Sequence, residues 1–331
     1  MENYYNKYLK YKQKCIQYGG EKQKTYCVKT EQNDFNKIMI KLLKKRGYIE
    51  SNIPPIDFIF VADQYQYYRN KIDTKGSEWI SLLYGKSKIE ITDKSILKKK
   101  FKNENFLING DIININDSIP KYNEKFVKIL KPLGGFAGSG IKIVQSNDEI
   151  SDWIKANPKY IDWIIEDYIT EPDLIDGYKF HFRVIILVKV VNQNIEVYIS
   201  NKKYYVKALE KYINGNYENK NIHDTHYKKI KIDMFPDVLP DNWNKKDADN
   251  AINDMNRIIK QIFFNNKNFY PDWNAKKGFE MFGADFIFEN KHTYLLEINS
   301  KMSLKGRTSI IDGLLSTILD NKPDGYFTKL I

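Results

Sequence analysis

Residues 126–144 read F-V-K-I-L-K-P-L-G-G-F-A-G-S-G-I-K-I-V, and this stretch says most about the architecture. It predicts two strands joined by a glycine-bearing turn, with Lys131 on the strand that enters the turn. Glycines allow close backbone approach, and N–H groups in such a turn, framed by a lysine, can wrap the phosphates of a nucleotide. The spacing differs from the Walker pattern, and Pro132 and the second strand argue against the helix of a Rossmann turn. A plain glycine hairpin is the alternative for this stretch alone.

The next informative stretch is residues 163–183, W-I-I-E-D-Y-I-T-E-P-D-L-I-D-G-Y-K-F-H-F-R. An apolar strand ends at residues 166–169 and is followed by a second strand that carries Lys179, His181 and Arg183. Alternate residues of a strand share one face, so these three side chains face the same way, opposite a phenylalanine-rich face. The pattern favours an anion-binding cleft against a packed core, and a solvent-facing strand is the alternative.

The third stretch, residues 278–300, is G-F-E-M-F-G-A-D-F-I-F-E-N-K-H-T-Y-L-L-E-I-N-S. It predicts two neighbouring strands, with Asp285 on the first and with Glu297 and Asn299 sharing a face of the second, so that all three can converge. Hard oxygen ligands on neighbouring strands suit one or two Mg²⁺ ions that bridge a nucleotide. Glu297 lies among leucine and isoleucine, where an unpaired carboxylate would be unfavourable, and a metal ion would offset that.

Hydrophobic periodicity and turn residues predict the remaining elements. Helices are expected at 34–45, 96–101 and 247–264 and in a short C-terminal tail. The other expected features are strands at 56–62, 105–109, 125–130, 283–289 and 293–298, a polar loop at 113–120, and an antiparallel hairpin over 178–208 that turns at 192–194. This mixture predicts an α/β (α+β) protein.

The composition is that of a soluble, intracellular globular protein. Of the 331 residues, 42% are apolar and 29% are charged, which excludes a disulfide-stapled mini-protein and wholesale disorder. Cys15 and Cys27 give no disulfide framework, and no apolar run is long enough to span a membrane. The net charge of +11 favours acidic partners, although abundant Lys, Asn, Ile and Tyr are also typical of an AT-rich genome.

Residues 1–30 are interpreted as a basic, Lys/Tyr-rich N-terminal appendage, in which Y-Y-N-K-Y-L-K-Y-K resembles short leaders of giant-virus proteins. The expected location is therefore the host cytoplasm, or the virion, if the chain is viral. After the appendage we expect an N-terminal α/β lobe at 31–120, a central lobe at 121–170, and a C-terminal lobe with the metal site at 171–331.

Four motifs occur in the order typical of the ATP-grasp ligases. They are K-P-L-G-G-F-A-G-S-G-I, E-D-Y-I-T-E-P-D-L-I-D-G-Y-K-F-H-F-R, F-E-M-F-G-A-D-F-I-F-E and L-L-E-I-N-S. More narrowly, they resemble the tubulin-tyrosine ligase-like family, and I-T-D-K-S-I-L-K-K-K-F from residue 91 resembles the lysine-bearing helix start of that family. The likeness covers about two-thirds of the chain, residues 90–304. It implies an ATP-grasp fold whose central and C-terminal lobes, with mainly antiparallel sheets, enclose ATP.

The resemblance also implies an activity. This is ATP-dependent ligation of an amino acid (Tyr, Glu or Gly) to a protein carboxylate through an acyl phosphate, with ATP and Mg²⁺ as cofactors. Phosphoryl transfer needs positioning and charge neutralisation more than a protein nucleophile. By motif position, the resemblance implies that the phosphates are bound by Lys94, Lys131, Gly138 and Gly140, and the adenine by Glu166, Asp167, Tyr168 and Ile169. It implies contacts along the nucleotide by Lys179 and His181, and stabilisation of the acyl-phosphate charge by Arg183. It also implies that Mg²⁺ is bound by Asp285, Glu297 and Asn299.

Some positions depart from the family's pattern. Glu166 and Asp167 replace its hinge Gln-Lys, His181 replaces an aspartate, Ala137 replaces an Arg or Gln, and a strand arginine has no clear counterpart. The family's H-L-T-N segment appears only as N-I-H-D-T-H at 221–226. Substrate recognition is therefore expected to differ from the family more than the ATP site does.

Three functions stay open at this point. The leading one is a ligase that acts on a protein chain, with the acidic tail of tubulin as a candidate acceptor. The second keeps the ATP chemistry but uses a small amino acid or a peptide, and the third is a catalytically inactive, basic binding module. The presence of Asp285, Glu297 and Asn299 argues against the third. Nucleic-acid binding is disfavoured because no aromatic-basic motif of recognised pattern is present.

Overall fold

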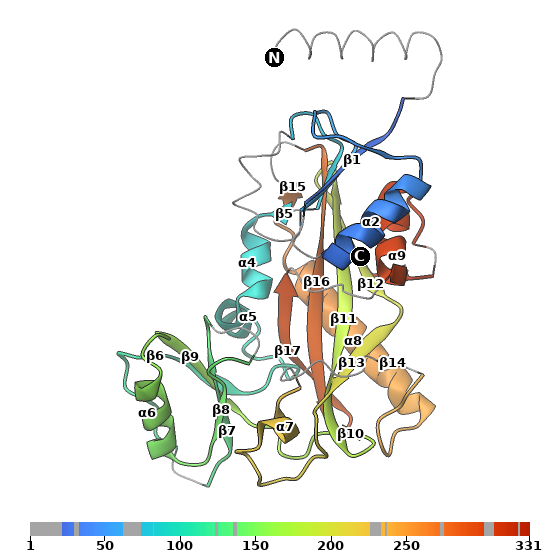
Figure 1. Ribbon diagram of the computed structural model, residues 1–331. Helices are drawn as coiled ribbons and strands as arrows, with labels where there is room; N and C mark the ends of the chain where they lie inside the picture. Colours follow the sequence, from blue (N-terminus) through green and yellow to red (C-terminus); the bar gives the residue numbers. More distant parts are fainter. Residues whose placement is uncertain are drawn as a thin grey trace.

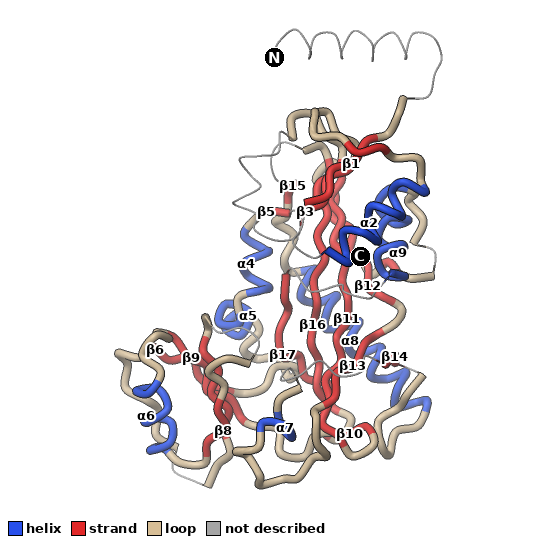
Figure 2. Tube along the Cα trace, in the orientation of Figure 1, coloured by secondary structure: helices blue, strands red, loops and turns tan. Residues whose placement is uncertain are grey.

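A computed structural model describes residues 22–29, 33–61, 74–81, 83–122, 125–134, 138–225, 233–235, 237–271, 275–300, 308–323 and 325–331. The described residues are divided between a large sheet, a smaller sheet beside its lower end, and helices that cover both (Figure 1). Figure 2 shows how closely the strands of the large sheet run together along the long axis of the molecule. The fold is mixed α+β, as the sequence predicts.

The large sheet has twelve described strands, and its two longest strands form the centre. These strands are β1 (Thr25–Lys29), β2 (Ile49–Glu50), β3 (Phe58–Val61), β4 (Trp79–Ile80), β10 (Leu174–Ile175), β11 (Tyr178–Val191), β12 (Asn194–Ser200), β13 (Lys203–Lys207), β14 (Asp233–Phe235), β16 (Lys277–Glu289), β17 (His292–Ser300) and β18 (Phe327–Lys329). The main path runs β14-β13-β11-β16-β4-β3-β1-β2. The pairings from β16 through β4, β3 and β1 to β2 are parallel, whereas β11, β16 and β17 pair antiparallel.

Most of the described helices pack on the two faces of this sheet, and one packs on the small sheet. The described helices are α2 (Asn33–Lys45), α4 (Lys86–Thr92), α5 (Lys94–Lys100), α6 (Asn147–Ala156), α7 (Lys220–His223), α8 (Lys245–Phe264) and α9 (Thr308–Leu319). Helix α8 starts with a capping box formed by Asn244 and Asp247 and packs on the β11 face that carries Phe180 and Phe182. Helices α2 and α9 cover the other face (Figure 1). The predicted phenylalanine-rich core face of residues 178–191 is thereby confirmed.

The small sheet has the order β6-β9-β7-β8 and is antiparallel throughout. Its strands are β6 (Gly110–Asn114), β7 (Lys128–Pro132), β8 (Lys142–Val144) and β9 (Asp162–Asp167), and a separate two-stranded pair joins β5 (Leu83–Tyr84) to β15 (Tyr270–Pro271). Helix α6 packs on one face of the small sheet around Trp163, which is fully buried. The predicted hairpin around the glycine turn is confirmed, because β7 and β8 pair antiparallel.

One predicted hairpin and two predicted helices are confirmed with small shifts. The hairpin over 178–208 turns at Asn192 and Gln193, whose φ angles of 49° and 67° are the left-handed values that a tight two-residue turn requires. The helix predicted at 34–45 is α2, and the helix predicted at 247–264 is α8.

One predicted strand was placed wrongly. Residues 105–109 form turns and a single bridge between Leu107 and Leu295, and the strand lies at Gly110–Asn114, partly within the predicted polar loop. The apolar signal of this stretch comes from Phe106 and Ile108, which are buried against neighbouring elements rather than paired in a ladder. Over so few residues, a buried loop and a paired strand give similar patterns of apolar residues in the sequence.

The N-terminal appendage lies mostly outside the described residues, which begin at residue 22. Thr25–Lys29, which the interpretation placed in the appendage, forms β1 and pairs with β2 and β3 inside the large sheet. Tyr26 and Cys27 are buried there. The appendage therefore ends before residue 25.

Candidate active site

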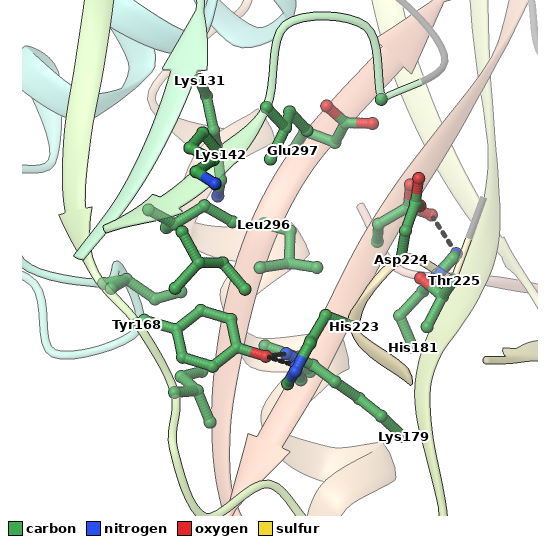
Figure 3. Close-up of a pocket in the computed structure, with 18 of the residues that line it drawn as sticks. Lys131, Lys142, Tyr168, Lys179, His181, His223, Asp224, Thr225, Leu296 and Glu297 are labelled. Atoms are coloured by element: carbon green, nitrogen blue, oxygen red, sulfur yellow. Dashed lines mark hydrogen bonds and ion pairs between the residues drawn. The ribbon is translucent and has the colours of Figure 1, made fainter. Parts of the chain in front are cut away.

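A pocket lies between the small sheet and the large sheet, and residues from both line it (Figure 3). Strands β7 and β8 contribute Ile129, Lys131 and Ile143, and the chain after β9 contributes Tyr168 and Ile169. The opposite wall comes from β11, β16 and β17. Residues implied by the family resemblance that line this pocket are Lys94, Lys131, Gly138, Asp167, Tyr168, Ile169, Lys179, His181, Arg183, Asp285, Glu297 and Asn299.

The lining of the pocket combines apolar and charged side chains. Isoleucines of the small sheet, together with Ile287 and Leu296 of the large sheet, supply its apolar part, called here the apolar slot. Lys94, Lys131 and Arg183 belong to its charged part. A pocket of this kind suits a ligand with a planar apolar ring at one end and several negative charges at the other.

Arg183 and Asp285 form a two-pronged ion pair in the charged part of the pocket. They are direct partners in the β11–β16 register, so their side chains leave the sheet side by side. Arg183 donates from Nε to Oδ1 at 2.7 Å and from Nη2 to Oδ2 at 2.5 Å. The Asp285 side chain is 0% exposed. Although burial works against the charge of Arg183, its hydrogen bonds to Asp285 raise the pKa of the guanidinium.

Glu297 lies across from Asp285 in the β16–β17 register, where the ladder shifts between Asp285 and Phe286. Its carboxylate receives a hydrogen bond from Asn299 Nδ2 at 2.6 Å and pairs with Lys94 Nζ at 2.6 Å. Lys94 is the first residue of α5, and Asp93 caps this helix by accepting hydrogen bonds from the backbone N–H groups of Ser95 and Ile96. Each acidic group of this wall thus has a cationic partner.

The donor set of Asp285, Glu297 and Asn299 fits Mg²⁺ in its chemistry. All three offer hard oxygen atoms, and the register places the two carboxylates on neighbouring strands facing one pocket. Among the residues that the structure describes, no group of three or more His, Cys, Asp and Glu side chains is close enough to hold a metal ion. A metal ion here would therefore depend on Asn299 or on oxygen atoms of the ligand.

Glu166 and Gly140 do not line the pocket. The Glu166 carboxylate lies between two lysines, at 2.7 Å from Lys98 Nζ and 2.5 Å from Lys131 Nζ. Burial alone would raise the pKa of Glu166, but the two lysines outweigh it and hold the pKa below its ordinary value. Gly140 instead accepts a hydrogen bond from Trp153 Nε1 at its carbonyl. Glu166 thus acts as the counter-ion that orients Lys131.

We expect Glu166→Gln to lower the free energy of unfolding by about 1.5–3 kcal/mol, because it weakens charge-assisted hydrogen bonds from two lysines. The same change frees Lys131 to move, so nucleotide binding should weaken as well. Urea unfolding followed by circular dichroism measures the first effect. Glu210→Gln, an exposed change on another segment, is the matched control, and equal stability of the two variants would contradict this role of Glu166.

A chain of hydrogen bonds joins the hinge after β9 to the segment 209–225. Lys179 Nζ donates to the Tyr168 hydroxyl at 2.6 Å, and that hydroxyl lies 2.6 Å from His223 Nδ1 (Figure 3). His223 Nε2 lies 2.8 Å from the carbonyl of Asn216. Since the hydroxyl accepts from Lys179, it donates to His223, which leaves the imidazole proton on Nε2 for Asn216. Burial lowers the pKa of His223 to about 4, which fits this neutral tautomer.

Lys179 is a buried cation with a strongly shifted pKa. Burial, aided by the charge of Lys131, lowers the pKa of Lys179 to about 7, although Glu289 and Asp224 act in the opposite direction. An anion bound in the pocket would raise this pKa again. The complex would then hold more protons than the free protein at pH values above 7.

We therefore expect the affinity for a polyphosphate ligand to fall as the pH rises above 7. The dissociation constant should increase up to tenfold per pH unit while the bound form keeps its proton, and should be nearly flat below 7. Titration calorimetry between pH 6 and 9 measures this. Lys179→Met is the control and should flatten the profile; an unchanged profile in this variant would assign the pH dependence to another group.

Segment 209–225 also contributes to the lining of the pocket. The sequence predicted this contribution only in part. Thr225 Oγ1 lies 2.6 Å from His181 Nδ1, and His181 Nε2 lies 3.8 Å from Asp285 Oδ1. Tyr217 and His223 also line the pocket. The only signal for this segment was the altered H-L-T-N motif, since residues 209–246 otherwise have a polar, irregular pattern.

The fold and this pocket define the class of protein. Two largely antiparallel sheets that enclose a lysine-rich pocket, with carboxylates at its base, are the arrangement of the ATP-grasp fold. The family model described as "Tubulin-tyrosine ligase family" matches residues 64–322. The chain belongs to this family.

Several relatives are similar to parts of the chain. Tubulin glycylase 3C of Tetrahymena thermophila is 28% identical over 216 residues, which are 60% of this chain and 20% of that protein. The probable tubulin polyglutamylase ttll-9 of Caenorhabditis elegans is 22% identical over 278 residues, 69% of this chain and 66% of that protein. The probable tubulin–tyrosine ligase C12B10.04 of Schizosaccharomyces pombe is 26% identical over 180 residues, 50% of this chain and 43% of that protein. The matched regions thus span between a fifth and two-thirds of these relatives.

Proposed function

We propose that this chain is an ATP-dependent carboxylate–amine ligase that adds an amino acid to a protein carboxylate. The observation that supports it best is the convergence of Lys94, Lys131 and Arg183 with Asp285 and Glu297 in one pocket between the two sheets. Such a site neutralises developing phosphate charge without a protein nucleophile.

The proposed reaction has two steps. An oxygen of the acceptor carboxylate attacks the γ-phosphorus of ATP, the bond to the bridging oxygen breaks, and ADP leaves with that electron pair. The amine nitrogen of the amino acid then attacks the acyl carbon, the amide C–N bond forms, phosphate leaves, and the amine proton is lost to solvent. Lys94 and Lys131 would bind phosphate oxygens, and Lys179 would lie along the nucleotide. Arg183 would stabilise the negative charge of the acyl phosphate and the tetrahedral intermediate.

Asp285, Glu297 and Asn299 would hold Mg²⁺, which neutralises charge on the β- and γ-phosphates when bound. The slot formed by the isoleucines of the small sheet would take the adenine, beside the backbone of residues 167–169. Holding both ends of the nucleotide orients its γ-phosphate toward the acceptor carboxylate.

The proposed acceptor is an acidic protein chain, with a tubulin tail as the first candidate. Two observations support it: the relatives are named as tubulin ligases, glycylases or polyglutamylases, and the chain carries a net charge of +11. Electrostatic attraction of this sign speeds the encounter with an acidic polypeptide. Tyr, Glu and Gly are the candidate amino acids.

The experiment is incubation of the protein with ATP, Mg²⁺, tubulin and a pool of single amino acids, followed by intact-mass analysis of the tubulin. An ATP-dependent mass increase by whole amino-acid residues supports the proposal and identifies the donor. Phosphate release without a mass change would move the acceptor to another protein or to a small molecule. Absence of both phosphate release and ATP binding would favour the inactive binding module.

A giant-virus source is proposed from the leader at residues 4–12, and the host cytoplasm or the virion would then be the place of action. The leader itself lies outside the described residues. Among the helices that the structure describes, none is both long and apolar enough to cross a membrane.

A further inference from the structure

Two acidic side chains of segment 209–225 lie beside the groups that would bind phosphate. Asp224 follows α7, and one of its carboxylate oxygens is so near Gly138 that a Cβ atom added to this glycine would lie 2.8 Å from it. Glu218 forms an ion pair with Lys142 of β8. Both acidic residues line the pocket. A polyphosphate bound at the glycine turn would meet two negative charges there.

The ion pair of Glu218 with Lys142 is more exposed than the pairs of Lys131 with Glu166 and of Arg183 with Asp285. The Glu166 and Asp285 side chains are almost completely buried, so their cationic partners hold them firmly. The Glu218 side chain is 79% exposed and that of Lys142 is 23% exposed. An exposed ion pair is weak and is screened by salt, so it can be exchanged for another anion at little cost in free energy.

The rest of the segment is anchored independently of these two carboxylates. His223 is held by Tyr168 on the side of the small sheet, and Thr225 is held by His181 on the large sheet (Figure 3). The backbone N–H groups of Leu209 and Glu210 donate to the carbonyl of Asn221. These anchors keep Asp224 next to Gly138 and Glu218 next to β8. A nucleotide can bind without displacing the anchors themselves.

The electrostatic effect of Asp224 on Lys179 also indicates that Asp224 lies near the cationic groups of the pocket. Its negative charge raises the pKa of Lys179, against the lowering by burial and by Lys131, so Asp224 lies within electrostatic range of that ammonium. A carboxylate next to a glycine turn and a buried lysine occupies the surroundings that suit a phosphate group.

We propose that Asp224 and Glu218 lie at positions that suit nucleotide phosphates and must be displaced when the nucleotide binds. This inference rests on the proposed function. The negative charges of these two residues then lower the affinity for ATP. Their removal tightens ATP binding, whereas removal of a phosphate-binding residue weakens it.

The test is titration calorimetry of the full chain with ATP and with AMP, in the presence of Mg²⁺, for the wild type, Asp224→Asn and Glu218→Gln. Both changes keep the side-chain shape and remove one negative charge. We expect ATP to bind roughly three- to tenfold more tightly to Asp224→Asn and roughly two- to threefold more tightly to Glu218→Gln, with smaller changes for AMP. Higher salt should reduce the effect of Glu218→Gln.

The matched control is Glu210→Gln, which removes the same charge from the same segment. Glu210 accepts hydrogen bonds from Asn219 and Asn221 and does not line the pocket, so ATP affinity should stay as in the wild type. An equal gain in this control would assign the effect to net charge and overturn the inference.

The possible outcomes separate the inference from the proposed function. Unchanged or weaker ATP binding in both variants, with normal binding by the wild type, would overturn the inference and leave the ligase proposal intact. Failure of the wild type to bind ATP would overturn both. Thermal unfolding gives a second readout: Glu218→Gln, which lies on the surface, should lower the melting temperature slightly without ATP and raise it relative to the wild type with ATP.

Discussion

Glu297→Gln should abolish turnover while the protein still folds. The change keeps the shape of a side chain that contacts Asn299 and Lys94, but it removes the negative charge. That charge would bind Mg²⁺ and, with Asp285, position the nucleotide phosphates. Loss of one preorganised electrostatic group at such a site lowers the rate by about 10²–10³-fold. Phosphate release with saturating ATP measures the loss.

Glu196→Gln is the control for this variant, because Glu196 pairs with Lys189 and Lys329 at the opposite part of the sheet. Its turnover should equal that of the wild type. Thermal unfolding of both variants checks that the fold is kept. Turnover of Glu297→Gln near the wild-type rate would remove Glu297 from the proposed metal site and would require another explanation for its pairing with Lys94.

Arg183→Ala should reduce both stability and turnover. Asp285 has no exposed side-chain surface, and the change would take away its two-pronged partner and leave a buried charge. The expected loss in the free energy of unfolding is about 3–5 kcal/mol. Turnover should fall more than ATP affinity, because Arg183 is proposed to act on charge that develops during the reaction.

Arg183→Lys and the double variant Arg183→Ala/Asp285→Asn separate these two effects. The lysine keeps the charge but cannot make both hydrogen bonds, so stability should be mostly restored and turnover only partly. The double variant removes the buried charge and should regain stability without activity. Denaturant unfolding and steady-state kinetics provide the numbers. A fall in ATP affinity larger than the fall in turnover would make Arg183 a ground-state binding residue.

Strand alternation in the sequence predicts much of the charged wall of the pocket. Lys179, His181 and Arg183 occupy alternate positions of one strand, and the structure places all three in the lining of the pocket. Asp285 and Glu297 were expected on adjacent strands, and their register brings them opposite each other. Local periodicity is sufficient where neighbouring strands are also neighbours in the chain.

Contacts between distant segments could not be derived in this way. Glu166 was assigned to the hinge by its motif, but its partners include Lys98, which another helix brings to it from 68 positions away. Lys94 meets Glu297 across an even larger separation. Segment 209–225 has no regular period, so its position over the pocket depends on side-chain contacts such as that of His223 with Tyr168. Such contacts follow from the packing of whole elements rather than from local pattern.

The parallel strands β1, β3 and β4 have a consequence for any shortened version of this protein. The family match begins at residue 64, yet β3 pairs with β4, which in turn pairs with β16, the strand that carries Asp285. A chain that started at residue 64 would leave β4 as an open edge next to the strand that carries Asp285. Unpaired edges recruit other chains, so such a fragment should self-associate more than the full chain does. Residues 25–61 therefore belong to the smallest unit in which β4 keeps its partner strand.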